Sequence, residues 1–408
     1  MGRINHLLLL TLVLALCFAA GVGQQMFPHP ASQTQAPAVS TKFEHSQYVG
    51  DAACLACHKD LALSYLQTAH HLTSQLGVKG SILGSFQEKS NVLMIFDPTT
   101  AEEVPGLYFK MEARTDGYVQ TAVTGWPGQQ QKRREFMDVV IGSGVRGQSY
   151  LYWHGDRLFE LPVSYWSDGR RWINSPGYRN GTMDFSRPVT PRCLECHATF
   201  IQSRSAELMS NSYDKDSLVT GISCESCHGP GAKHVTLHRS AMPVVQLTKY
   251  GILNPAGLSR DRQVDLCALC HNGLRQIQTR PAFSFVPGQP LDNYLQPSSP
   301  DTDTQPNVHG DQVGLLKKSR CYQSSPNMSC STCHDVHAPE RTAASYSTRC
   351  LSCHKVENCG MSKVIGAKIA NNCVDCHMPV QSTNTIVSET AGQLIRPSMR
   401  THWIKIYR

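Results

Sequence analysis

Between residues 80 and 185, the hydrophobic positions fall in short segments that turn residues separate. The turns are Asp116–Gly117, His154–Asp156 and Asp168–Gly169, and short apolar segments around such residues are typical of β-hairpins. The pattern therefore predicts three hairpins in an antiparallel β module with its own aromatic core. The predicted strands cover residues 107–113, 118–124, 150–153, 158–163, 163–166 and 170–173.

Two other segments have distinct patterns. Leu61, Tyr65 and the following histidines recur with roughly helical spacing, which predicts a helix that ends near Gly77. The proline-rich stretch Pro281–Pro306 shows no periodicity and predicts a long surface loop.

The N-terminal pattern predicts export. Arg3 precedes the apolar run Leu7–Ala20, and small residues follow, which is typical of a signal peptide cleaved near Gly21–Gln25. We therefore expect a periplasmic protein, with an uncleaved anchor or a lipid on Cys17 as alternatives. Residues 24–46 have the composition of a flexible linker.

The pattern Cys-x-x-Cys-His occurs seven times. It is the attachment signature of c-type haem: two thiols bond to the porphyrin, and the next histidine binds iron. Structural zinc, a thioredoxin-like site or disulfides would leave the seven adjacent histidines unexplained. The sequence therefore predicts seven covalent haem c groups. The attachment cysteines are Cys54, Cys57, Cys193, Cys196, Cys224, Cys227, Cys267, Cys270, Cys330, Cys333, Cys350, Cys353, Cys373 and Cys376. The motif histidines are His58, His197, His228, His271, His334, His354 and His377.

Each haem iron has a second axial position, for which the sequence offers further histidines. Trans imidazoles on one iron place their Cα atoms roughly 13 Å apart, whereas three residues reach at most about 11 Å. His337 therefore cannot share the iron of His334, and as a ligand it would bind a different haem. The favoured second ligands are His70 or His71, His234, His309, His337 and His402. Less favoured candidates are His45, His154 and His238.

Two cysteines remain in the predicted mature chain. Cys321 and Cys359 belong to no motif, and in an oxidising compartment we expect a disulfide between them. A thiolate on iron or a free reactive thiol are the alternatives.

The net charge is +7 before cofactors are counted. An oxidised bis-histidine haem carries roughly −1 and a reduced one roughly −2, because of its propionates. Seven haems would bring the total to about zero when oxidised. We therefore expect no nucleic-acid partner; the expected partners are redox proteins, soluble or associated with a membrane.

Six motifs lie within residues 193–377, which leaves too little chain for an ordinary apolar core. The predicted fold class is α+β with little regular structure: short helices and loops around stacked haems, plus the antiparallel β insert. The predicted domains are a signal peptide (1–23), a linker (24–46), a first haem segment (47–79), the β module (80–185) and a six-haem domain (186–408).

The motif segments resemble the periplasmic multihaem cytochromes c that include the tetrahaem cytochrome of hydroxylamine oxidation. The resemblance is carried by YVGDAACLACH, RPVTPRCLECH, GISCESCHGPGAKH, CSTCHDVH and NCVDCHMP, and it spans most of residues 47–408. It implies bis-histidine haems and one-electron transfer, with His234, His337 and His402 bound to neighbouring haems. The CxxCK motif of the related nitrite reductases is absent, and nothing identifies the cross-linking tyrosine of the hydroxylamine-oxidising enzymes.

Two functions fit these observations. An electron conduit, a carrier rather than an enzyme, is favoured. The alternative is a reductase of a small nitrogen or sulfur oxyanion, which needs an open iron and a basic pocket. Lys233, Arg192, Lys317 and Lys318 are the basic candidates near haems, although they would also pair with propionates. The spare histidines predict little or no binding of carbon monoxide.

Overall fold

The computed structural model describes residues 44–97, 99–240, 251–273, 276–297, 311–339, 342–383 and 385–407. Residues 41–408 form one compact unit. The predicted signal peptide, Cys17, most of the predicted linker and His309 lie outside the described residues. Within the described ranges, no helix has the length and hydropathy that a membrane span requires.

All three predicted hairpins are confirmed. Each consists of two antiparallel strands around the predicted turn. The pairs are β3 (Glu103–Arg114) with β4 (Gly117–Thr124), β7 (Gly147–His154) with β8 (Arg157–Glu160), and β9 (Val163–Trp166) with β10 (Arg171–Asn174). The first turn is tight, because Arg114 pairs with Gly117, whose φ of 144° lies in a region that glycine adopts easily.

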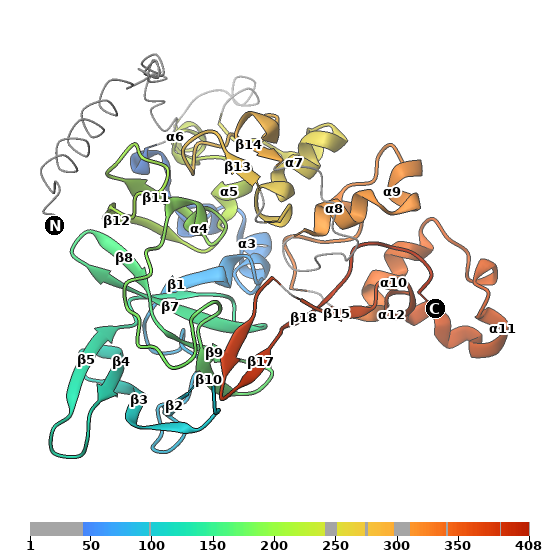
Figure 1. Cartoon of the computed structure of the whole chain (residues 1–408). Helices are drawn as coiled ribbons and strands as arrows, with labels where there is room; N and C mark the ends of the chain where they lie inside the picture. The colour runs from blue at the N-terminus through green and yellow to red at the C-terminus, as the bar shows by residue number, and fades with distance from the viewer. Residues whose placement is uncertain are drawn as a thin grey trace, which may run out of the picture. The chain divides into compact units, whose positions relative to one another are not determined.

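These hairpins belong to two sheets (Figure 1). β2 (Val92–Phe96) and β5 (Gln131–Phe136) complete a four-stranded sheet in the order β2-β3-β4-β5. The second sheet has the order β1-β6-β7-β9-β10, with β8 on β7; it adds β1 (Ser74–Leu76) and β6 (Val139–Ile141). Both sheets contribute to one core, in which Phe109 and Tyr150 are completely buried. Burial of each such side chain contributes about 1.5–3 kcal/mol.

The helix expected to end near Gly77 is shorter than predicted. α3 (Lys59–Tyr65) ends early, and a 3-10 turn at His71–Thr73 leads into β1. Ser74 pairs with Ile141 on β6, and the Gly77 N–H donates to the Asp138 carbonyl over 2.8 Å. Pairing with the sheet therefore overrides the helical spacing of the sequence.

The parts of the chain that carry the motifs contain short helices, as predicted. The helices are α2 (Asp51–Leu55), α4 (Pro191–Glu195), α5 (Cys224–His228), α6 (Ala232–Arg239), α7 (Arg260–His271), α8 (Gln312–Lys317), α9 (Arg320–Ser324), α10 (Ala343–Leu351), α11 (Ser362–Ile365) and α12 (Val374–His377). The strand pairs are β11 (Ala198–Ser203) with β12 (Tyr213–Thr220), β13 (Gln276–Gln278) with β14 (Leu295–Pro297), β15 (Val380–Ser382) with β18 (Ser398–Arg400), and β16 (Ser388–Thr390) with β17 (Gln393–Ile395). This mixture of helix and strand is α+β.

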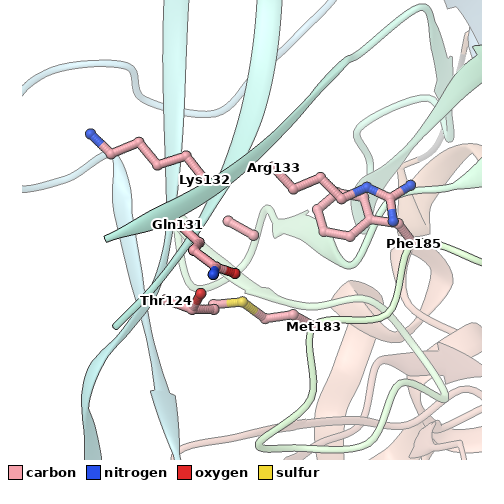
Figure 2. Close-up of a pocket in the computed structure, with 7 residues that line it drawn as sticks. Thr124, Gln131, Lys132, Arg133, Met183 and Phe185 are labelled. Atoms are coloured by element: carbon pink, nitrogen blue, oxygen red, sulfur yellow. The ribbon is translucent and has the colours of Figure 1, made fainter. Parts of the chain in front are cut away.

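A pocket of about 210 Å³ lies beside β4 and β5 of the four-stranded sheet (Figure 2). The Arg133 guanidinium lies 4.5 Å from the centre of the Phe185 ring, and both residues line the pocket. None of the lining residues belongs to a CxxCH motif. The pocket is therefore not part of the candidate haem sites.

Candidate haem sites

Four motif histidines face a second histidine across a gap. The distances between ring centres lie within a narrow range. They are 6.4 Å for His58–His234, 6.2 Å for His228–His337, 6.1 Å for His334–His402 and 6.0 Å for His70–His271.

This separation fits two axial ligands on one iron. A metal–nitrogen bond is about 2 Å long, and the nitrogen lies about 1.1 Å from the centre of its ring. Two trans imidazoles therefore place their ring centres about 6.2 Å apart. The four pairs match this value, so the residues present fit bis-histidine ligation of haem iron.

The relative orientation of the rings differs among the pairs. Three pairs have interplanar angles of 23–24°. In the fourth pair, the planes of His70 and His271 are almost perpendicular, at 82°. We therefore expect this site to differ spectroscopically from the other three, because the orientation of axial imidazoles splits the iron d orbitals.

The facing histidine always comes from a segment that follows a different motif. His234 lies on α6, directly after the third motif, and faces the first motif. His337 lies three residues after the fifth motif and faces His228 of the third. His334 is too near in the chain to share an iron with His337, and the structure places His228 of the third motif opposite it instead.

The remaining two pairs connect distant parts of the chain. His70, after the first motif, faces His271 of the fourth. His402, near the C-terminal end of the described residues, faces His334 of the fifth. The Ser319 hydroxyl fixes this last segment, because it donates to the His402 carbonyl over 3.1 Å and accepts from the Ile404 N–H over 2.8 Å.

The structure does not bring the other candidates opposite a motif histidine. The Nδ1 atom of His71 lies 3.1 Å from the Asp51 carboxylate, so of the pair His70–His71 only His70 faces a motif ring. His45 stacks on Phe200, with ring centres 6.4 Å apart.

Two further candidates are also placed elsewhere. His238 packs beside His234 at 4.4 Å, and His154 is exposed at the end of β7. Across the described residues, no histidine ring faces His197, His354 or His377. His309 lies outside them.

The surroundings favour neutral imidazoles, which metal binding requires. Burial, followed by the nearby His334, lowers the pKa of His402 to about 4. Burial also lowers the pKa of His234 and of His337. These rings therefore remain unprotonated near neutral pH.

Backbone carbonyls orient two motif histidines. His228 Nδ1 lies 2.7 Å from the Leu253 carbonyl, and His377 Nδ1 lies 2.9 Å from the Lys405 carbonyl. Since a carbonyl only accepts, each Nδ1–H must donate. This arrangement leaves Nε2 free for a metal.

Attachment thiols of different motifs are in direct contact. A hydrogen bond between Cys54 and Cys224 lowers the pKa of Cys54 and raises that of Cys224. Hydrogen bonds of the same kind join two further pairs of thiols, Cys196–Cys270 and Cys267–Cys330. The first and third, second and fourth, and fourth and fifth motifs are therefore neighbours.

The pKa values of two further thiols show which other motifs lie close together. The pKa of Cys350, in the sixth motif, is raised by burial first and then by the nearby Cys373 and Cys333. These cysteines belong to the seventh and fifth motifs. The pKa of Cys267, in the fourth motif, is raised chiefly by its contact with Cys330 and, to a lesser degree, by Cys227 of the third.

The expected disulfide is absent. Cys321 and Cys359 are both free. Cys321 instead lies near Cys333 and Cys350, whose pKa values are raised first by burial and further by neighbouring cysteines, Cys321 among them. The fold therefore places Cys321 beside the fifth and sixth motifs, and the predicted disulfide with Cys359 does not form.

Arg192, predicted as a basic residue near a haem, contacts two motifs. Its guanidinium donates to Glu195, 2.7 Å away, and to the Leu269 carbonyl at 2.6 Å. Glu195 belongs to the second motif and Leu269 to the fourth. The hydrogen bond to Leu269 therefore ties the second motif to the fourth, and the ion pair with Glu195 orients the guanidinium for it. The acidic residue between the cysteines of the second motif was the signal that could have indicated this ion pair.

Comparisons with known proteins point to one class. The family Cytochrome c554 and c-prime matches residues 177–229, which contain the second and third motifs. The C-type polyheme cytochrome OmcC of Geobacter sulfurreducens is 28% identical over 93 residues, which are 22% of this chain and 11% of that protein. The chain thus matches only about a tenth of this relative's length.

A solved structure extends the likeness to most of the chain. The Outer Cell Wall Cytochrome OcwA has a TM-score of 0.53 and 18% identity, with 88% of this chain and 80% of that chain covered. The likeness shows that the fold is that of a multihaem cytochrome. Together with the recurrent motifs, these comparisons support a multihaem c-type cytochrome with covalently bound haem c.

Proposed function

We propose that the chain is a seven-haem periplasmic cytochrome that transfers electrons through closely packed bis-histidine haems. The observation that carries the proposal is the set of four histidine pairs at 6.0–6.4 Å, each with its second ligand from a segment outside the motif it faces. Haem iron supplies one-electron chemistry when bound. The chain's own residues would hold four of the irons from both sides and tie neighbouring sites together.

The thiol contacts support an order for the sites. The first motif touches the third, the fourth lies near the third and touches the second and the fifth, and the fifth lies near the sixth, which lies near the seventh. We infer a main path from the first site through the third, fourth, fifth and sixth to the seventh, with the second as a branch from the fourth.

The proposed location and partners follow from the same chemistry. Covalent attachment of haem and the predicted signal peptide support the periplasm. A chain of sites needs a donor at one end and an acceptor at the other, so we propose redox proteins as partners, soluble or associated with a membrane.

The test is a haem count combined with a count of open irons. The mass of the mature protein should equal the chain plus seven haems, without residues 1–23. Carbon monoxide added to the reduced protein should leave at least four haems unchanged, because their axial positions are occupied by paired histidines. A count of six or fewer, or carbon monoxide binding at more than three haems, would show that the proposal is wrong.

A further inference from the structure

Glu225 is a buried carboxylate inside the third haem motif. It occupies the first variable position of Cys224–His228, and only 2% of its surface is exposed. Three backbone N–H groups donate to it: Val49 to Oε1 at 3.0 Å, Gly50 to Oε2 at 2.9 Å and Gly231 to Oε1 at 2.7 Å. Buried carboxylates need such donors.

The three donors belong to the segments that carry the ligands of another site. Gly50 is the N-cap of α2, which bears Cys54 and precedes His58. Gly231 is the N-cap of α6, which bears His234. The rings of these two histidines face each other at 6.4 Å. One carboxylate therefore holds the starts of both segments that supply the first site's axial ligands.

The opposite contact is also present. The Asp51 carboxylate, at the start of α2, accepts from the Cys224 N–H over 3.1 Å. The Cys54 and Cys224 sulfurs lie close together in the same region. Carboxylate-to-backbone hydrogen bonds thus run in both directions between the segments of the first and third motifs.

We propose that Glu225 is a positioning residue for the first haem: from the third motif, it sets the separation of His58 and His234 on that iron. The inference rests on the proposed function, since it assumes that these histidines are axial ligands. It assigns a role to a residue that the haem-attachment pattern leaves variable. The space around Gly231 is correspondingly tight, because a Cβ there would lie 3.2 Å from Glu225 Oε1.

The test compares three variants of the full chain with its haems attached. Glu225→Ala removes both acceptors. Glu225→Gln keeps the shape but replaces one oxygen with an NH₂ group, which cannot accept from a backbone N–H. Asp60→Asn is the control, because it removes an exposed acidic charge from α3, close to His58 in sequence.

Three readouts apply: haems attached, by mass; low-spin signals, by electron paramagnetic resonance; and carbon monoxide bound by the reduced protein. We expect Glu225→Ala to keep its haems but to lose one low-spin signal and to bind one more equivalent of carbon monoxide than the parent. Glu225→Gln should shift one low-spin signal, and Asp60→Asn should match the parent.

Parental spectra in the alanine or glutamine variant would overturn the proposal, as would simultaneous changes at several haems, which indicate a general folding role. If Glu225→Ala does not accumulate, Glu225→Gln decides by the same criterion. The parent's haem count tests the proposed function separately, whereas the difference between variant and parent tests Glu225.

Discussion

At the scale of single residues, the ligand role of His337 is the most direct to test. Its ring faces His228 at 6.2 Å, whereas chain reach excludes His334. We expect His337→Ala to retain every haem, because attachment uses only the motif cysteines. One haem should become high-spin, bind one equivalent of carbon monoxide and have a higher reduction potential, since the lost imidazole stabilises oxidised iron.

The matched control is His154→Ala, which removes an exposed histidine at the end of β7. Spectra and potentiometric titrations of both variants and the parent would be compared. If His337→Ala and His154→Ala are equally like the parent, His337 is not a ligand.

At the scale of elements, the C-terminal segment serves two sites at once. His402 faces His334 of the fifth motif, and the Lys405 carbonyl accepts from His377 of the seventh. Removal of residues 401–408 should therefore open the fifth iron and also release the seventh motif's histidine. We expect one additional equivalent of carbon monoxide and altered potentials at two haems.

His402→Ala separates these effects, because it removes the ligand and keeps the backbone carbonyl of Lys405. It should open the fifth site and leave the seventh unchanged. A truncated protein with the parent's spectrum and potentials would contradict the assignment of this segment.

At the scale of the whole molecule, the fourth site lies in the middle of the inferred path. His70→Met should raise the potential of that haem, because methionine favours reduced iron relative to histidine. A rise of about 100 mV would favour retention of the electron there by about fiftyfold, since 59 mV is a factor of ten for one electron. Electron transfer from end to end, followed by stopped-flow absorbance, should slow accordingly.

His234→Met is the control, because it changes the first site, at one end of the path. It should alter one potential by a similar amount and affect transit much less. Equal slowing by both variants would show that the fourth site is not on the main path.

The sequence by itself determined the cofactor and much of the local structure. Two cysteines and a histidine at fixed spacing are sufficient for haem attachment, because the chemistry is local to five residues. The three hairpins were predicted for the same reason: turns such as Asp116–Gly117 act over a few residues. The likeness to multihaem cytochromes supports the prediction of haem c as the cofactor.

Only the tertiary structure decided which groups meet. Chain reach could exclude His334 as a partner for His337, but it could not select His228, which lies more than a hundred residues away in the sequence. The prediction of a Cys321–Cys359 disulfide was wrong for the same reason, because packing between distant segments decides whether two cysteines meet. Ligand pairing and the contacts of Glu225 are properties of long-range packing, whereas a sequence pattern records only neighbours along the chain.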